Sequence, residues 1–196
     1  MRPTNCFYET DLPAGYQEAM VVDAKKTRTI VLLNLAAIVV LFAVAAAVYA
    51  AIRPLDHPFT ITPTDLGIFA VLLFVYILLH ELVHGLAYKL LTGQKLTFGM
   101  TLATAYCGVP NIYVYRQTAL IALLAPFVLF TFVLLIAMVA VTNPWWQFLL
   151  GILLATHLSG CVGDLYDTLL YLTRFRDPAT LMQDTGPKQT FYTKKN

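Results

Sequence analysis

The sequence predicts an all-α integral membrane protein with about four transmembrane helices and a short β-hairpin or re-entrant segment between the second and third. Apolar residues make up 59% of the 196 residues, and the mean hydropathy is +0.70. Charged residues make up only 12%, which is half of the about 25% that is usual in soluble domains. The apolar residues are also grouped into four segments, each of which reaches the roughly 20 residues that a spanning helix needs.

These four segments predict a single membrane domain, residues 29–173, and the distribution of Lys and Arg predicts its orientation. Lys and Arg, which mark the cytoplasmic side, gather before the first segment, between the second and third, and after the fourth. We therefore expect the N-terminal segment (1–28) and the tail (174–196) in the cytoplasm. Because the leading polar region is long and the apolar run after it can span the bilayer, we expect no cleavable signal peptide. The spans are expected at about residues 29–52, 66–91, 118–141 and 145–173.

Polar caps mark where two of these spans begin. The run from Thr62 to Asp65 combines an N-cap, a proline at the first helical position and an acidic residue in the first turn. Asn143-Pro144 repeats the cap and the proline before the fourth span. Trp145 and Trp146 follow directly, as is typical of the aromatic belt at a membrane interface.

The segment at about residues 95–116 does not read as a helix. Glycines and a proline interrupt it, whereas Lys95–Tyr106 and Ile112–Tyr115 are rich in the Thr, Phe and Tyr that favour strands. Backbone at membrane depth must be paired or buried in protein. We therefore predict a hairpin that packs against the helices.

Charge and cysteine content exclude two classes of protein. The net charge of +2 and the lack of a basic cluster exclude a nucleic-acid binder. The three cysteines, Cys6, Cys107 and Cys161, form no CxxC pair and no disulfide framework, which excludes a disulfide-stapled secreted protein.

Ionisable side chains inside the predicted spans point to function. Burying such groups in hydrocarbon costs roughly 2.5–3.5 kcal/mol even on mild scales for charged groups, so they usually face the bundle interior and serve a task. In this chain they are His80, Glu81, His84, His157, Asp164 and Asp167.

The second span carries the pattern H-E-x-x-H at residues 80–84. On a helix, residues four apart share a face, so His80 and His84 can reach one metal ion. Two neutral imidazoles suit zinc, which lowers the pKa of its bound water to about 7. Glu81 lies about 100° round the helix from His80, where it can move protons without being a ligand. We predict His80 and His84 as zinc ligands and Glu81 as the general base.

A catalytic zinc ion needs a third protein ligand, with water in the fourth position. At about 1.5 Å per residue from the basic residues at the cytoplasmic ends, only the two aspartates match the depth of the histidine pair. His157 is expected to be a hydrogen-bonded core residue unless the fourth helix breaks near Gly160 or Gly163, and Cys161 a small buried residue. Asp167 can also serve as a hydrogen-bond acceptor for a ligand. The open candidates are Asp164, Asp167, His157 and Cys161.

The order of these features resembles the core of site-2 proteases, which are intramembrane zinc metalloproteases. The segments His80–Gly85, Leu124–Phe127 and Gly163–Asp164 are also similar to a bacterial family described as putative zincin peptidases. The resemblance covers roughly residues 66–172. It implies a bacterial plasma membrane as the location.

The resemblance also implies roles for single residues. His80 and His84 fall on the metal-binding histidines, Glu81 on the general base and Asp164 on the aspartate ligand. Site-2 proteases usually have Leu-Asp-Gly around that aspartate, whereas this chain has Gly163-Asp164-Leu165. The third ligand is therefore less firmly assigned than the other two.

These features predict an intramembrane zinc metalloprotease that hydrolyses peptide bonds of membrane-embedded or membrane-proximal substrates near the cytoplasmic face. The expected partners are the lipid bilayer and a membrane-protein or peptide substrate, which could add as a strand to a free edge of the hairpin. Two alternatives stay open: a non-catalytic metal-binding membrane protein, and a proton or cation transporter. Glu81 favours catalysis, because structural zinc sites are typically closed by four protein ligands.

Overall fold

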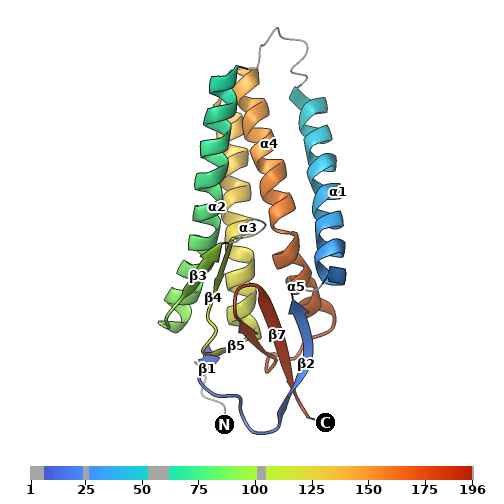
Figure 1. Cartoon of the computed structure of the whole chain (residues 1–196), viewed down its shortest axis with the longest axis vertical. Coiled ribbons are helices and arrows are strands. Elements are labelled where there is room, and N and C mark those ends of the chain that lie inside the picture. The colour runs from blue at the N-terminus through green and yellow to red at the C-terminus, as the bar shows by residue number, and fades with distance from the viewer. Residues whose placement is uncertain (1–6, 24–26, 53–61, 101–104, 196) are drawn as a thin grey trace. The chain divides into compact units, whose positions relative to one another are not determined.

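The computed structural model describes residues 7–23, 27–52, 62–100 and 105–195, and it is mostly helical (Figure 1). In chain order its elements are β1 (Tyr8–Glu9), β2 (Tyr16–Asp23), α1 (Thr27–Ile52), α2 (Pro63–Thr92), β3 (Thr97–Met100), β4 (Ala105–Gly108), β5 (Tyr113–Tyr115), α3 (Arg116–Ala140), α4 (Pro144–Gly160), α5 (Val162–Thr173), β6 (Leu181–Asp184) and β7 (Lys188–Lys194).

Three of the helices, α1, α2 and α3, are long and apolar enough to cross a membrane. The pair α4 and α5 makes a fourth candidate if the two helices count as one span. They are bent by 45° relative to each other at a short break. This agrees with the prediction of about four spans. The fourth span is broken, however, and the break lies at Cys161, next to the glycine where a break was considered.

The predicted caps are formed. The Thr62 hydroxyl accepts from the Asp65 backbone N–H at 3.3 Å, and the Asp65 carboxylate accepts from the Thr62 N–H at 2.9 Å. The Asn143 side chain accepts from the backbone N–H groups of Trp145 and Trp146 at 2.9 and 3.3 Å. These contacts satisfy N–H groups that have no partner within the helix itself.

A five-stranded antiparallel sheet shows where the all-α prediction was wrong. Its strand order is β1-β5-β6-β7-β2. Four of these strands lie in the N-terminal segment (1–28) and the tail (174–196), which were expected only to be polar and cytoplasmic. Strand β2 pairs with β7 from Tyr16↔Lys194 to Asp23↔Lys188. The pairing joins opposite ends of the chain, so no short window of sequence reveals it. Strand β5, which was expected to continue the hairpin, pairs instead with β1 and β6.

The predicted hairpin is present as the antiparallel pair β3 and β4, with Thr97 opposite Gly108 and Met100 opposite Ala105. Residues 101–104, which fall within the expected strand-forming stretch Lys95–Tyr106, lie outside the described residues, as does Cys6. The hairpin packs against α2 at Gly85. A Cβ atom there would lie 2.7 Å from Phe98 Cζ and 3.2 Å from Cys107 Sγ, so the close approach requires glycine.

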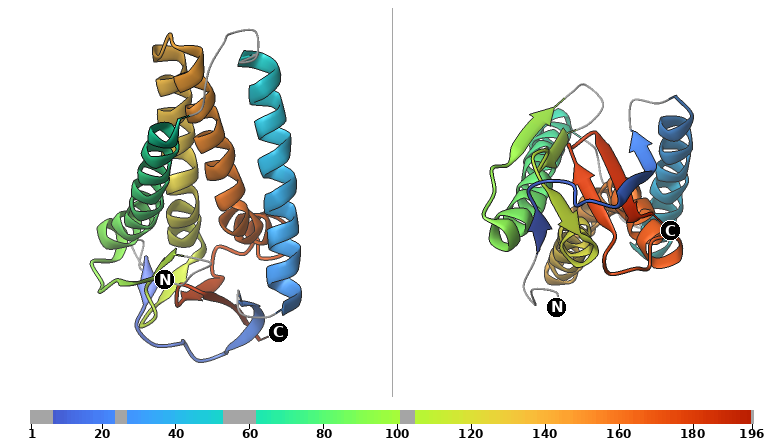
Figure 2. Two further views of the ribbon diagram at one scale, coloured as in Figure 1. Left: turned by 45° about the horizontal axis from the view of Figure 1, so that its top comes forward. Right: turned by 90° about the horizontal axis from the view of Figure 1, so that it is seen from below.

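The chain forms two compact units. The first contains residues 1–31, 81–126 and 164–196 and holds all seven strands that the structure describes, seen from below in Figure 2. Its apolar core joins helix residues to strand residues. The core consists of Val22, Tyr88, Val109, Ile112, Val114, Ala119, Ala122, Leu123, Tyr171, Phe175, Met182 and Phe191.

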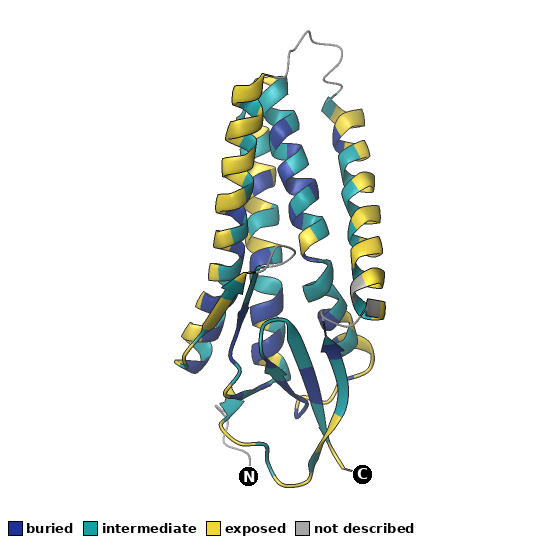
Figure 3. Ribbon diagram, viewed as in Figure 1, coloured by how far each residue is buried: buried dark blue, intermediate teal, exposed yellow. Residues whose placement is uncertain are grey.

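The second unit contains residues 32–80 and 127–163, and its described elements are all helical. Its buried apolar cluster is small: Tyr76, Leu134, Leu153 and Leu154. Many large apolar side chains point outward instead, as the exposed residues of α1 and α2 in Figure 3 show. Exposed apolar faces of this extent mark contact with a membrane or another protein, which agrees with spanning helices.

Candidate metal centre

Helix α2 places the H-E-x-x-H residues. It runs unbroken from Pro63 to Thr92, so His80 and His84 lie one turn apart on the same face. Both histidines are buried, with 7% and 8% of their surface exposed, and Glu81 is half-buried. Buried imidazoles must be hydrogen-bonded or bound to a metal, so their surroundings decide what they can do.

In the first unit, His84 lies between a backbone carbonyl and a carboxylate. Its Nδ1 atom is 2.9 Å from the carbonyl oxygen of Ala122 on α3. Pro126 lies four residues further along that helix and has no N–H to donate. The Ala122 carbonyl, which a regular helix would pair with residue 126, is therefore available to His84. The proline explains a hydrogen bond that the sequence analysis did not foresee.

The other nitrogen of His84 faces Asp164, with Nε2 at 3.4 Å from Oδ2. A carbonyl only accepts hydrogen bonds, so Nδ1 carries a hydrogen and Nε2 of the neutral ring is an acceptor. Two acceptors that face each other need a proton or a cation between them. Ligand atoms that share a tetrahedral zinc ion at about 2.0–2.2 Å lie about 3.4 Å apart, so this pair fits zinc.

Two predicted candidates for the third ligand lie on α5, and the structure distinguishes them. Asp164 is in the first turn of α5 and its Oδ2 atom faces His84 Nε2. Asp167 lies three residues later and is only 3% exposed. Its Oδ1 atom has no hydrogen-bond partner among the residues that the structure describes. The contact with His84 therefore belongs to Asp164, and Asp167 is a buried carboxyl group nearby in the chain.

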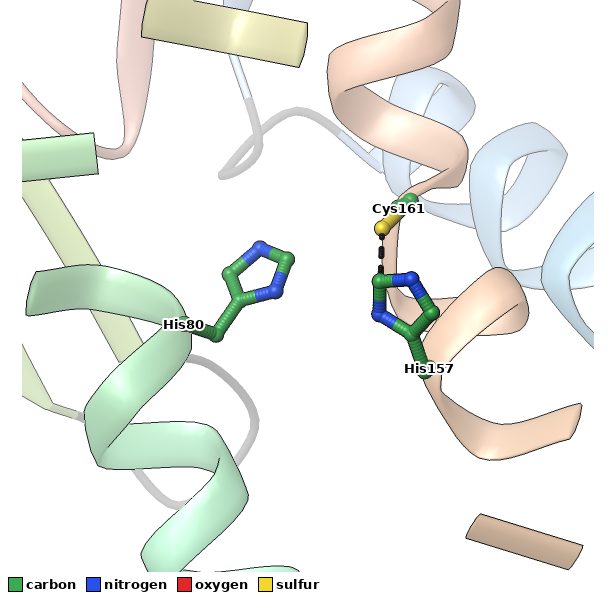
Figure 4. A group of neighbouring side chains, drawn as sticks. All are labelled: His80, His157 and Cys161. Carbon is green, nitrogen blue, oxygen red and sulfur yellow. Dashed lines mark hydrogen bonds between the residues drawn. The ribbon is translucent and has the colours of Figure 1, made fainter. Parts of the chain in front are cut away.

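The other two candidates lie in the second unit together with His80. Nitrogen atoms of His80 and His157 and the sulfur of Cys161 all lie within 4.8 Å of one another (Figure 4). Cys161 caps the end of α4, and its Sγ is 3.6 Å from His157 Nδ1. Tyr76 lies one turn before His80 on α2, and its hydroxyl contacts both histidines. Tyr76 was not among the residues predicted from the sequence, and its i, i+4 spacing from His80 is the one signal that points to it.

The hairpin flanks the H-E-x-x-H residues of the first unit. Its residue Cys107 is buried, and burial together with the negative charges of Asp184 and Glu81 raises the pKa of the thiol to about 12. Without a metal beside it, Cys107 is therefore a neutral thiol at physiological pH.

A second interaction missed from the sequence ties the C-terminal strands to α2. The Tyr88 hydroxyl donates to Asp184 Oδ2 at 2.8 Å, and the Gly186 N–H donates to the other oxygen at 2.8 Å. Burial raises the pKa of Asp184 to about 6, although these hydrogen bonds favour its charged form. The carboxylate thus links β6 to the helix that carries His84.

Comparison with known proteins identifies the family of the chain. A family model described as putative zincin peptidase, a family of zinc metallopeptidases, matches residues 73–179, which is more than half of the chain. The match includes the H-E-x-x-H helix and Asp164, and it does not single out site-2 proteases. No curated protein and no solved structure matches the chain. The chain belongs to the family of putative zincin peptidases.

Proposed function

We propose that the protein is an intramembrane zinc metalloendopeptidase with a site-2-protease-like arrangement. It hydrolyses peptide bonds of membrane-embedded or membrane-proximal substrates near the cytoplasmic face. The observation that carries the proposal is the His84 Nε2–Asp164 Oδ2 contact at 3.4 Å beside an H-E-x-x-H helix. The family and the three to four apolar helices support the peptidase and the membrane parts.

The proposed zinc ligands are His80, His84 and Asp164. The unbroken helix puts both histidines on one face, and Asp164 meets the second of them. The donor set of two imidazoles and one carboxylate is typical of catalytic zinc, which keeps one position open. When bound, zinc supplies a Lewis acid that polarises the scissile carbonyl and activates water.

Glu81 is the proposed general base. It directly follows His80 and projects about 100° away round the helix, beside the metal-binding face. A carboxylate at this position takes a proton from the attacking water and then delivers it to the leaving amine. It performs this role without occupying a ligand position.

The free edge of β3 is the proposed substrate-binding strand. Among the described residues β3 pairs only with β4, so its other edge is open to a further strand. The hairpin contacts α2 at Gly85, directly after His84. An extended peptide bound along this edge has its carbonyls out of helical hydrogen bonds, as hydrolysis requires.

Zinc content and substrate cleavage together test the proposal. We expect about one zinc ion per wild-type chain purified in detergent, and none in His84→Ala. The variant Glu81→Gln should keep its zinc and lose hydrolysis. Hydrolysis would be measured as new protein N-termini, which are compared between membranes of cells that express the wild type and membranes of cells that express Glu81→Gln.

Two results would contradict the proposed function. One is a wild-type protein that holds no zinc after purification from metal-replete cells without chelators. The other is a set of cleavage products that persists unchanged in Glu81→Gln.

A further inference from the structure

The second unit contains a buried polar network that the proposed reaction does not use directly. It consists of Tyr76, Thr131 and His157, and it ends at His80. His157 is completely buried and Tyr76 is 8% exposed. Figure 4 shows His80 on α2 facing His157 near the end of α4. Buried polar groups in an apolar unit must be paired, and the pairing here has a definite direction.

The order of donors and acceptors along these hydrogen bonds is set first by the carbonyl oxygen of Phe127. His157 Nε2 lies 3.3 Å from this oxygen and 3.1 Å from Thr131 Oγ1. Because a carbonyl can only accept, Nε2 carries a hydrogen. The Tyr76 and Thr131 hydroxyls and the Phe127 carbonyl are neutral and the unit is apolar, so a charged imidazolium there would be costly and we take the ring as neutral. Its Nδ1 atom is therefore an acceptor.

The Tyr76 hydroxyl joins His157 to His80, so the acceptor role of His157 Nδ1 determines which nitrogen of His80 carries its hydrogen. The Tyr76 hydroxyl lies 2.8 Å from His157 Nδ1 and must donate its one hydrogen there. Its oxygen also lies 3.0 Å from His80 Nδ1 and so accepts from that nitrogen. His80 consequently carries its hydrogen on Nδ1, so Nε2 is the nitrogen that keeps a lone pair, as a metal ligand must.

We propose that Tyr76 and His157 are positioning residues that set the tautomer of His80 for metal binding. The inference rests on the proposed function, in which His80 is a zinc ligand. His84 reaches the same tautomer through the Ala122 carbonyl in the first unit. Partners that fix the tautomer of a ligating histidine typically change metal affinity about 10- to 100-fold when removed.

A competing reading gives the metal to His80, His157 and Cys161, whose donor atoms lie within 4.8 Å of one another. Both ring nitrogens of His157 already have partners: the Tyr76 hydroxyl at 2.8 Å and Cys161 Sγ at 3.6 Å on Nδ1, and the Phe127 carbonyl on Nε2. A metal on Nδ1 would have to displace the Tyr76 hydroxyl. The network therefore favours the positioning role, and the competing site becomes an outcome of the test.

Nitrogen-15 NMR of histidine-labelled, metal-free protein tests the tautomers directly, because the chain has only four histidines. We expect a hydrogen on Nδ1 of His80 and on Nε2 of His157. His84 should keep its hydrogen on Nδ1 and, without a metal, share a further proton with Asp164. In Tyr76→Phe the His80 signals should move towards a mixture of tautomers, whereas the His84 signals should not change. A hydrogen on Nε2 of His80 in the wild type would overturn the proposal.

Zinc affinity, measured by competition with a chelator, gives the second readout. Tyr76→Phe should weaken zinc binding about 10- to 100-fold. The matched control Tyr49→Phe removes a hydroxyl from a 43% exposed residue of α1 and should have no effect. Equal affinities in Tyr76→Phe and wild type would also overturn the proposal.

Cadmium-113 NMR distinguishes the competing site. A cadmium shift typical of thiolate ligation that disappears in Cys161→Ser would assign the metal to the His80–His157–Cys161 set and overturn the proposal. A wild-type protein that binds no zinc would contradict the proposed function. The tautomers of the metal-free protein would still decide whether Tyr76 and His157 orient His80.

Discussion

The two units keep different kinds of polar groups in their interiors. The first unit buries the carboxyl groups of Asp167 and Asp184. In the part of the second unit that the structure describes, the buried polar residues are His80 and His157, which belong to a neutral network. The buried carboxyl groups thus lie in the unit that contains the strands, where Asp184 accepts from Tyr88 and Gly186. In the unit with outward-facing apolar helices, the two buried histidines are joined through the Tyr76 hydroxyl. In the proposed function, a histidine inside a span acts as a ligand or as a positioning residue according to its partners.

The largest expected effect is on zinc binding, through the two proposed ligands that lie in the first unit. His84→Ala and Asp164→Asn should each weaken it more than about 100-fold, beyond the about 10- to 100-fold effects of residues that only orient ligands. Asp167→Asn is the matched control on the same helix and should retain most of the affinity. The measurement is chelator competition on detergent-purified protein. Loss of zinc in Asp167→Asn with retention in Asp164→Asn would reverse the assignment of the third ligand.

The next effect concerns Asp184, whose buried carboxyl has a pKa of about 6 against 3.8 for an exposed aspartate. The folded state then binds more protons than the unfolded state between about pH 4 and 6. Stability should therefore fall as the pH rises through this range, by about 3 kcal/mol at most. Urea unfolding in micelles at several pH values measures the slope.

Asp184→Asn provides the control for that slope. The variant cannot titrate, so its stability should change less between pH 4 and 6 even if it is less stable throughout. An unchanged slope would show that another group is responsible.

A smaller effect is expected from Pro126→Ala. The new N–H competes with His84 Nδ1 for the Ala122 carbonyl, so zinc affinity should fall by up to about 10-fold. Pro144→Ala is the control, because Pro144 lies at the start of α4, where a missing N–H costs nothing. Equal affinities in the two variants would show that the freed carbonyl does not hold His84.

The smallest effect is expected where the hairpin meets α2. In Gly85→Ala the new Cβ would lie 2.7 Å from Phe98 Cζ, and such overpacking costs about 1–3 kcal/mol. The higher helix propensity of Ala returns about 1 kcal/mol, so a net loss of about 1 kcal/mol is expected in thermal or urea unfolding. In a Phe98→Leu background the same change should be neutral or stabilising. A loss of the same size in both backgrounds would contradict this account of the contact.

Much of the helical part of the fold could be predicted from the sequence. Hydropathy is a local property, and it located α1, α2 and α3 to within a few residues. Short-range cap signals at Thr62 and Asn143 marked two helix starts correctly. The five-stranded sheet could not be predicted in this way, because β2 and β7 pair across nearly the whole chain.

The order of residues alone was enough to propose His80, Glu81 and His84, since i, i+4 spacing on one helix is a local geometric property. It left four candidates for the third ligand open, because they lie on a different helix. The contact of His84 with Asp164, the carbonyl released by Pro126, and the direction of the Tyr76–His157 hydrogen bonds required the folded structure. Each of these depends on distances between segments that are remote in sequence, and only packing sets such distances.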